Sequence, residues 1–419
     1  MDPIMTTESR VPAAESQERT LGPWKSWRIL LLANACSLLG NYAQNLALPL
    51  WVLSVTGSYT ATGVTFAVGT LPVVLCAPLA GRIVDRYDRL RVFIACELLC
   101  AALVLVLVMG VRAENLTVVY VTSALLKAVG SASVPAVQAL LKERVPADQA
   151  RPVIAKFEVV FGGAMSLGPL VGAALADGVG IEGALWVNLA SFLVSGILAL
   201  ALRRPGAESP ALPRTDDRPR GQVAPLRWSG IGPRLRRVAL AEASYFLFLG
   251  SEVVIALAVF KQSAGVAAAA GYQTLAGIGW IVGSSLVVRR FNRQPRVIWA
   301  GAAVSTVATA ALVLSGSSWS WAAIVVVGLL GGAGNVMIAG ASTVVYQELT
   351  SNEVIGRIFA FRRAMLNLLM TVSYIVVPFA GELTAHPAPV LLVAGVVNLV
   401  VTTLLLAPYR GDGTGGRGD

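Results

Sequence analysis

Twelve long apolar runs alternate with short polar segments along this chain of 419 residues. Each run is close to or longer than the roughly 20 residues that an α-helix needs to cross the hydrocarbon core of a bilayer. The pattern therefore predicts an all-α membrane protein with twelve transmembrane helices. We place them at residues 27–55, 61–81, 92–111, 116–141, 153–176, 183–202, 237–260, 266–288, 297–314, 319–347, 358–381 and 388–407.

The composition agrees with a membrane protein, because 56% of the residues are hydrophobic and only 13% are charged, against about 25% charged residues in soluble domains. A net charge of +10 would suggest nucleic acid as a partner of a soluble protein. Here the basic residues lie between apolar runs and not on one aqueous face, so we expect no binding of nucleic acid. The lipid bilayer is the expected partner, and we expect a monomer.

The basic residues also predict the orientation in the membrane. When the N-terminal tail, the loops after even-numbered runs and the C-terminus are assigned to one side, that side holds 30 of the 33 Lys and Arg residues. The other side holds Arg112 and Lys261, and Lys127 lies within a run. Positive charge accumulates on the cytoplasmic side. We therefore expect a multi-pass protein of the inner (cytoplasmic) membrane with both termini in the cytoplasm.

A segment rich in Pro and Arg, residues 203–236, divides the apolar runs into two groups of six. We expect a cytoplasmic tail (1–26), an N-terminal six-helix bundle (27–202), a cytoplasmic linker (203–236), a C-terminal six-helix bundle (237–407) and a second tail (408–419). The charged loop 82–91 after the second run has a weaker counterpart at 289–293 after the eighth, which suggests a repeat. Two repeated six-helix halves are typical of a secondary transporter that rocks around a central site.

The loop after the second run carries the first motif, formed by Gly81, Asp85, Arg86, Arg89 and Arg91. Together with the twelve-helix layout, these residues resemble the loop motif G-x-x-x-D-R-x-G-R-R/K of the major facilitator superfamily, although an aspartate, residue 88, replaces the usual second glycine. The resemblance implies a transporter fold in which this loop is a cytoplasmic latch that breaks and reforms. The simpler interpretation is that the arginines only set the topology.

The fifth run carries a second motif, with Gly163, Gly168, Pro169 and Gly172 in the segment 162–172. It is similar to the pattern G-x-x-x-G-P-x-x-G that is associated with exporters and antiporters of this superfamily. Small residues at helical spacing let a neighbouring backbone approach, and proline bends the helix. Ordinary close packing is the alternative interpretation of the same residues.

Ionisable residues inside apolar runs are the candidates for proton coupling. Glu252 lies near the middle of the seventh run with no basic neighbour, and an unpaired carboxyl there favours its neutral form. It is expected to exchange a proton or to hold a cationic substrate; a satisfied hydrogen bond between helices is the alternative. Glu97 and Lys127 lie at similar depths, so we expect either a structural ion pair or a part in proton coupling. Glu242, nearer the cytoplasm, is a further candidate.

The substrate cavity is expected between the halves. A polar stripe in the first run cannot face lipid. The resemblance implies an acid after Gly40, but this chain has Asn41. Aromatic and polar groups in other runs could complete the cavity. The candidates are Asn41, Gln44, Asn45, Tyr245, Phe248 and Asn335.

The sequence contains no motif for a metal site, for ATP hydrolysis or for a hydrolase. The four cysteines lie in apolar runs and are expected to be packing residues. The single His386 has no Cys or His nearby, so we expect no metal site. The chain has no G-x-x-x-x-G-K-[ST] loop for ATP, and no H-E-x-x-H or G-x-S-x-G motif of a hydrolase. We therefore expect no cofactor and no enzyme activity.

The sequence favours a transporter that exports a small amphiphilic or hydrophobic compound, such as a drug, an antibiotic or a siderophore-like molecule, in exchange for protons. A nutrient importer or an uncoupled facilitator of the same superfamily is the alternative. A receptor or scaffold without transport would leave the buried carboxyls and the paired halves unexplained.

Overall fold

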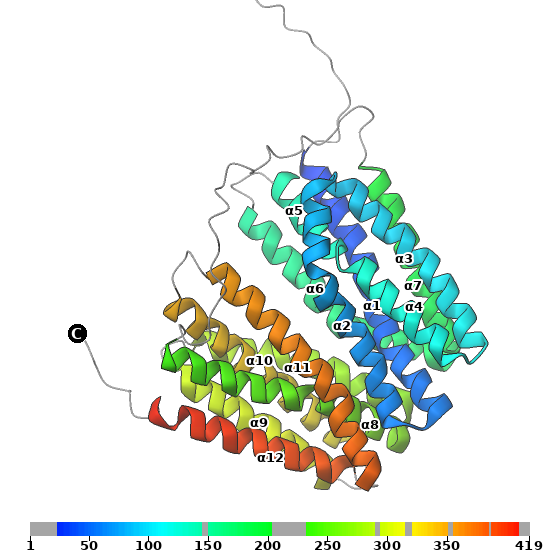
Figure 1. Ribbon diagram of the computed structural model, residues 1–419. Helices are drawn as coiled ribbons and strands as arrows, with labels where there is room; N and C mark the ends of the chain where they lie inside the picture. The colour runs from blue at the N-terminus through cyan, green and yellow to red at the C-terminus, as the bar shows by residue number, and fades with distance from the viewer. Residues whose placement is uncertain are drawn as a thin grey trace, which may run out of the picture.

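The computed structural model describes residues 23–144, 150–202, 232–289, 294–314, 321–350, 355–384 and 387–409. In these ranges the chain forms twelve α-helices and one short 3-10 helix (Figure 1). The helices are α1 (Pro23–Thr56), α2 (Tyr59–Arg86), α3 (Arg89–Arg112), α4 (Leu116–Gly130), α5 (Ser133–Arg144), α6 (Ala150–Gly178), α7 (Ile181–Leu200), α8 (Pro233–Arg289), α9 (Gln294–Leu314), α10 (Trp321–Leu349), α11 (Ile355–Thr384), α12 (Pro387–Leu406) and the 3-10 helix η5 (Ala407–Tyr409).

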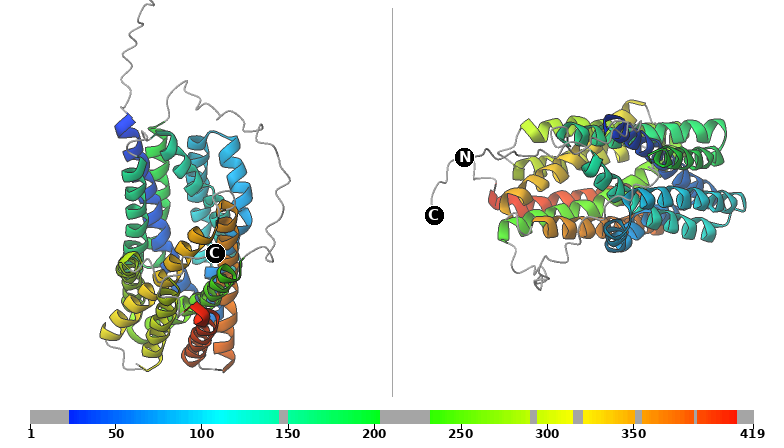
Figure 2. Two further views of the ribbon diagram at one scale, coloured as in Figure 1. Left: turned by 90° about the vertical axis from the view of Figure 1, so that its left-hand side faces the viewer. Right: turned by 90° about the horizontal axis from the view of Figure 1, so that it is seen from above.

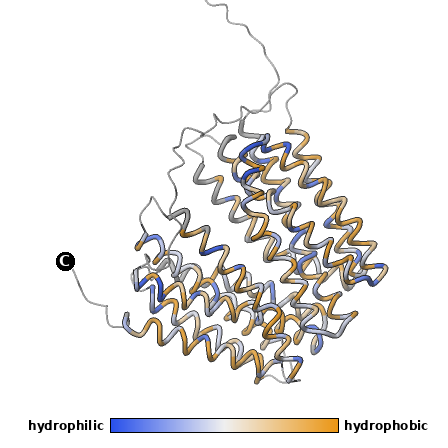
Figure 3. The backbone as a smooth tube through the Cα atoms, viewed as in Figure 1, coloured by the Kyte–Doolittle hydropathy of each residue, from blue (hydrophilic) through white to orange (hydrophobic). Residues whose placement is uncertain are grey.

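All twelve predicted runs are largely helical within the described residues, and the predicted all-α membrane fold is confirmed. Among the described residues, ten helical segments are long and apolar enough to cross a membrane, and Val160–Ala176 is a shorter apolar helix. Figure 3 shows the same pattern, with hydrophobic positions along most of both bundles. Large parts of the predicted tails and linker, residues 1–22, 203–231 and 410–419, lie outside the described residues, as does His386.

Two helix boundaries differ from the predicted ones. The run 116–141 is divided into α4 and α5 at Ser131, whose hydroxyl donates a hydrogen bond to the Ala128 carbonyl at 2.6 Å. The element labelled α8 contains the predicted runs 237–260 and 266–288 as two helices that meet at a kink at Gly265. Gly265 has a φ of 81°, a left-handed conformation that glycine adopts without steric cost. The polar residues Lys261, Gln262 and Ser263 precede the bend, so the two runs are separate candidate membrane spans, Pro233–Gln262 and Ala264–Ser284.

The helices form two groups, α1–α7 and α8–α12, which lie at an angle to each other (Figures 1 and 2). The C-terminal group has one large apolar core, which also takes in Leu46 and Leu50 of α1 and Ala173 of α6, and the N-terminal group has two further cores. The groups meet along α2 and α11, where the Phe66 and Tyr374 rings stack with centroids 5.3 Å apart. They meet again along α6 and α8, where Thr274 Oγ1 donates to the Ser166 carbonyl at 3.1 Å. These two contact lines frame the space between the halves.

The loop motif lies in the tight turn between α2 and α3, at the end of the molecule where the two groups diverge (Figure 1). Asp88, the departure from the superfamily motif, is the N-cap of α3, and its carboxylate accepts a hydrogen bond from the Arg91 backbone N–H at 2.7 Å. Asp85 is exposed and makes no ion pair with the described residues.

Candidate functional site

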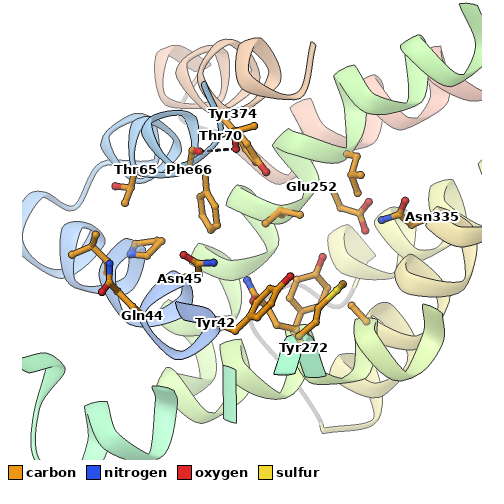
Figure 4. A pocket seen from close by; sticks show the side chains of 18 of the residues that line it. Tyr42, Gln44, Asn45, Thr65, Phe66, Thr70, Glu252, Tyr272, Asn335 and Tyr374 are labelled. Atoms are coloured by element: carbon orange, nitrogen blue, oxygen red, sulfur yellow. Dashed lines mark hydrogen bonds between the residues drawn. The ribbon is translucent and has the colours of Figure 1, made fainter. Parts of the chain in front are cut away.

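A cavity of about 340 Å³ lies between the two helix groups. The N-terminal group contributes side chains from α1, α2, α4 and α6, and the C-terminal group contributes side chains from α8, α10 and α11. Figure 4 shows how rings and polar groups from both sides point into one space. The lining includes Tyr42, Gln44, Asn45, Thr65, Phe66, Thr70, Ser123, Lys127, Met165, Glu252, Tyr272, Gln273, Trp280, Asn335 and Tyr374.

Lys127 on α4 supplies the positive charge of the cavity wall. Its ammonium Nζ donates a hydrogen bond to Asn45 Oδ1 on α1 at 2.7 Å. The ion pair that we expected between Glu97 and Lys127 is not formed. Similar depth in two neighbouring helices does not make two side chains face each other, because helix rotation directs Lys127 toward α1 and the cavity.

Glu252 on α8 supplies an acidic group on the opposite wall. The side chain is only 3% exposed, and its Oε2 has no hydrogen-bond partner among the described residues. Gly331 on α10 makes room for the carboxyl, since a Cβ at that position would lie 2.8 Å from Glu252 Oε1. The Asn335 side chain faces the carboxyl (Figure 4). A buried carboxyl with an unused oxygen can accept a proton or a donor group of a ligand.

Glu97 on α3 lies outside the cavity lining, in a cluster of serines within the N-terminal group. Ser37 of α1 and Ser133 of α5 donate to its Oε1 at 3.3 and 3.1 Å. Ser195 of α7 lies beside the same carboxyl. Both Glu97 Oε2 and Ser195 Oγ are buried without a partner in the described part of the chain. One proton on Oε2 would satisfy both atoms.

Glu242 on α8 forms a buried ion pair with Arg362 on α11. Arg362 donates two hydrogen bonds to the carboxylate, one from Nε at 2.8 Å, and a third to the Ala339 carbonyl at 3.1 Å. The guanidinium also lies over the Tyr346 ring. A carboxylate held by two N–H donors of an arginine is a poor proton carrier, so this geometry favours a structural role for Glu242.

The expected cavity residues divide into two sets. Gln44, Asn45 and Asn335 line the cavity. Asn41 does not, because its amide donates to the Ser37 carbonyl of its own helix at 2.9 Å. Tyr245 and Phe248 do not line it either. They are buried in the core of the C-terminal group, where Phe248 packs against Gly395 of α12.

Tyr42, Tyr272 and Gln273 line the cavity but were absent from the sequence prediction. A signal for one face was present, since Tyr272, Ala276 and Trp280 recur every four residues in one run. Gln273 beside them marked the run as one that could not face lipid on all sides.

The glycines of α6 pack against α1, as the small-residue spacing predicted. A Cβ at Gly172 would lie 2.4 Å from the Ala43 carbonyl oxygen, and one at Gly168 would lie 2.3 Å from Tyr42 Cβ. Both helices also line the cavity, α1 through Tyr42 and α6 through Met165. Gly163 has nothing within 4 Å of such a Cβ, so close approach is confined to the other two glycines.

The family model described as Major Facilitator Superfamily matches residues 30–374, which is most of the chain and extends from α1 into α11. The chain belongs to the major facilitator superfamily. The predicted membership, and the prediction that the protein is a transporter and not an enzyme, are therefore confirmed.

Two known proteins are similar in sequence to this superfamily member. "Multidrug efflux pump Tap" of Mycolicibacterium fortuitum is 28% identical over 299 residues, which cover 67% of this chain and 72% of the relative. "Uncharacterized MFS-type transporter YkuC" of Bacillus subtilis is 27% identical over 177 residues, 42% of this chain and 41% of the relative. The chain thus matches less than half the length of YkuC, and half the length of the Tap proteins of Mycobacterium tuberculosis.

Solved structures of the superfamily share the fold. A bacterial homologue of the iron transporter ferroportin, in an inward-facing state, superposes with a TM-score of 0.70 at 16% identity, covering 93% of this chain and 100% of that one. The nucleoside transporter NupG superposes with a TM-score of 0.68 at 13% identity, covering 92% of this chain and 99% of that one. At these identities the likeness concerns the arrangement of the helices alone.

Proposed function

We propose that this superfamily member exports a small amphiphilic or hydrophobic compound across the cytoplasmic membrane in exchange for protons. The substrate binds in the cavity between the halves, and the halves rock to expose it to either side in turn. In this proposal both termini and the basic loops lie in the cytoplasm, as the distribution of Lys and Arg favours. The turn between α2 and α3 is then the cytoplasmic latch.

The position of Glu252 carries the proposal. It is buried in the wall of the central cavity, and its Oε2 has no described partner. A carboxyl there can be neutral with a proton or charged beside a donor of the substrate, and it cannot be left charged and unpaired without a large desolvation cost. Binding of a proton at Glu252 therefore disfavours binding of the substrate there, and the reverse also holds. Exchange of substrate for protons requires this competition.

The direction of transport rests on weaker similarities. The α6 motif resembles that of exporters, and a relative that covers 67% of this chain is named as a multidrug efflux pump. Glu97 is our second candidate for a proton site, because one proton would pair its free oxygen with Ser195. We retain no proton role for Glu242, whose charge is neutralised by Arg362.

Transport into everted membrane vesicles tests the proposal. Cationic dyes, macrolides and siderophores are supplied with and without a protonophore. We expect accumulation of at least one compound, loss of that accumulation with the protonophore, and loss of proton-driven transport in Glu252→Gln. The matched control is Glu348→Gln, an exposed carboxyl at the end of α10 outside the cavity lining, which should transport as the wild type does.

Two outcomes contradict the proposal. Equal accumulation with and without a proton gradient would identify a facilitator. Unchanged proton-driven transport in Glu252→Gln would remove Glu252 from the exchange step. Expression and monodispersity of each variant are compared first, so that loss of transport is not mistaken for loss of folding.

A further inference from the structure

Two side chains of opposite charge face the same cavity from opposite halves of the molecule. Lys127 projects from α4 in the N-terminal half, and Glu252 projects from α8 in the C-terminal half. No ion pair joins the two in the described structure. The cavity therefore presents one basic and one acidic group that are not paired with each other.

Each of these groups has unused hydrogen-bonding capacity. The Lys127 ammonium has three N–H donors. Asn45 Oδ1, a neutral amide oxygen, accepts a hydrogen bond from it at 2.7 Å. Glu252 Oε2 has no partner in the described chain, and the side chain is 3% exposed. A buried charge without an opposite charge nearby is costly, so both groups favour a ligand that supplies the missing charge.

The surface around the two charged groups is largely aromatic and apolar. Phe66, Trp280 and Tyr272 line the cavity together with Met165. The rings of Phe66 and Tyr374 stack on each other, which fixes part of this wall. An apolar body with charged ends therefore fits the lining better than a uniformly polar solute does.

We propose that the substrates of this transporter are amphiphiles that carry both a basic amine and an acidic group. The amine binds Glu252, the acidic group binds Lys127, and the apolar body packs on the rings between them. A substrate with one charge would leave the opposite group of the cavity without a partner. The inference rests on the proposed export function and adds the substrate class.

This class of substrate is also suited to exchange of the substrate for protons. A protonated amine and a proton both satisfy the Glu252 carboxyl, so a substrate arriving at Glu252 displaces the proton. Lys127 has no such competitor. Its role is to select among amines by requiring a second, anionic group, which makes it a specificity-determining residue.

Binding to the purified protein tests the inference. The probes are two unrelated zwitterions, norfloxacin and ampicillin, and their methyl esters, which keep the amine and lose the anion. Isothermal titration gives the Kd of each. We expect the wild type to bind at least one zwitterion about tenfold more tightly than its ester, the size of one charge-assisted hydrogen bond. This comparison needs no variant and so no assumption about folding.

The variant Lys127→Met keeps the length of the side chain and removes its charge. We expect it to bind the zwitterion about tenfold more weakly and the ester within twofold of the wild type. Lys156→Met is the matched control, because Lys156 is an exposed residue of α6 outside the cavity lining and should keep the preference.

The inference is overturned if the esters bind as tightly as the parent compounds, if Lys127→Met keeps the preference, or if neither zwitterion binds. None of these results bears on the proton dependence of transport or on its loss in Glu252→Gln, which the vesicle assay measures separately. Proton-driven export of dyes with no preference for zwitterions would therefore refute the substrate class and retain the proposed function.

Discussion

The carboxylate of Glu382 on α11 caps the first turn of α2 through Thr60. The Thr60 backbone N–H donates to Glu382 Oε1 at 3.0 Å, and its hydroxyl donates to Oε2 at 2.6 Å. Ser58, the N-cap of α2, adds a third hydrogen bond to Oε1 at 2.8 Å. The N-terminus of α2 carries positive partial charge, so it favours a carboxylate. These contacts hold the two halves together at this end of the molecule.

We expect Glu382→Gln to weaken this closure, because the amide lacks the charge and has one acceptor oxygen in place of two. The effect on the balance between the closed and open forms of this end should be several-fold, about 0.5–1.5 kcal/mol, since the site is exposed. Distances between spin labels at the start of α2 and the end of α11 measure it. Glu114→Gln, an exposed carboxyl between α3 and α4, is the control. Unchanged distances in Glu382→Gln would show that the cap does not hold the halves.

The packing of α6 on α1 gives a second prediction. Gly172→Ala places a Cβ 2.4 Å from a backbone oxygen that cannot rotate away, so the helices must separate. We expect a loss of about 1–3 kcal/mol in stability, measured by thermal unfolding in detergent. Gly162→Ala on the same helix is the matched control, because nothing lies within 4 Å of its Cβ position. Equal melting temperatures for the two variants would contradict the observed packing.

The buried pair of Glu242 and Arg362 predicts non-additive stability effects. Glu242→Gln should destabilise the protein by about 3–5 kcal/mol, because it leaves the guanidinium without its counter-charge. Replacing both residues, as Glu242→Leu with Arg362→Met, should recover much of that loss. Chemical unfolding of Glu242→Leu, of Arg362→Met and of the double variant measures the coupling. A proton role for Glu242 would instead give a stable Glu242→Gln protein with altered proton coupling.

The serine cluster around Glu97 predicts a difference between two substitutions. In Glu97→Gln the amide can donate to Ser195 while its oxygen still accepts from Ser133, so stability should change by less than about 1 kcal/mol. Glu97→Leu leaves buried hydroxyls without a partner and should cost about 1–3 kcal/mol. If Glu97 carries a proton, Glu97→Gln should also lower the number of protons exchanged per substrate in proteoliposomes. An unchanged ratio would make the cluster purely structural.

Hydropathy located all twelve membrane runs because the free energy of moving a side chain from water into lipid depends mainly on that side chain. It can therefore be read from the sequence alone. Hydropathy also separated the two spans that meet at Gly265. It did not predict the break at Ser131, where the hydroxyl bonds to a backbone carbonyl and one run is divided into α4 and α5. Sequence reasoning also identified Glu252 and Lys127, since an ionisable residue inside an apolar run is rare and easily noticed.

The sequence by itself thus determined the number of membrane runs, the two halves and the few buried charges. Only the tertiary structure decided the partners of those charges: Lys127 binds Asn45, 82 positions away, and Glu242 binds Arg362, 120 positions away. The physical reason is that hydropathy records whether a side chain leaves water, whereas its partner depends on how each helix rotates and packs on the others. That rotation turned Tyr245 and Phe248 into the core and left Lys127 and Glu252 facing one cavity.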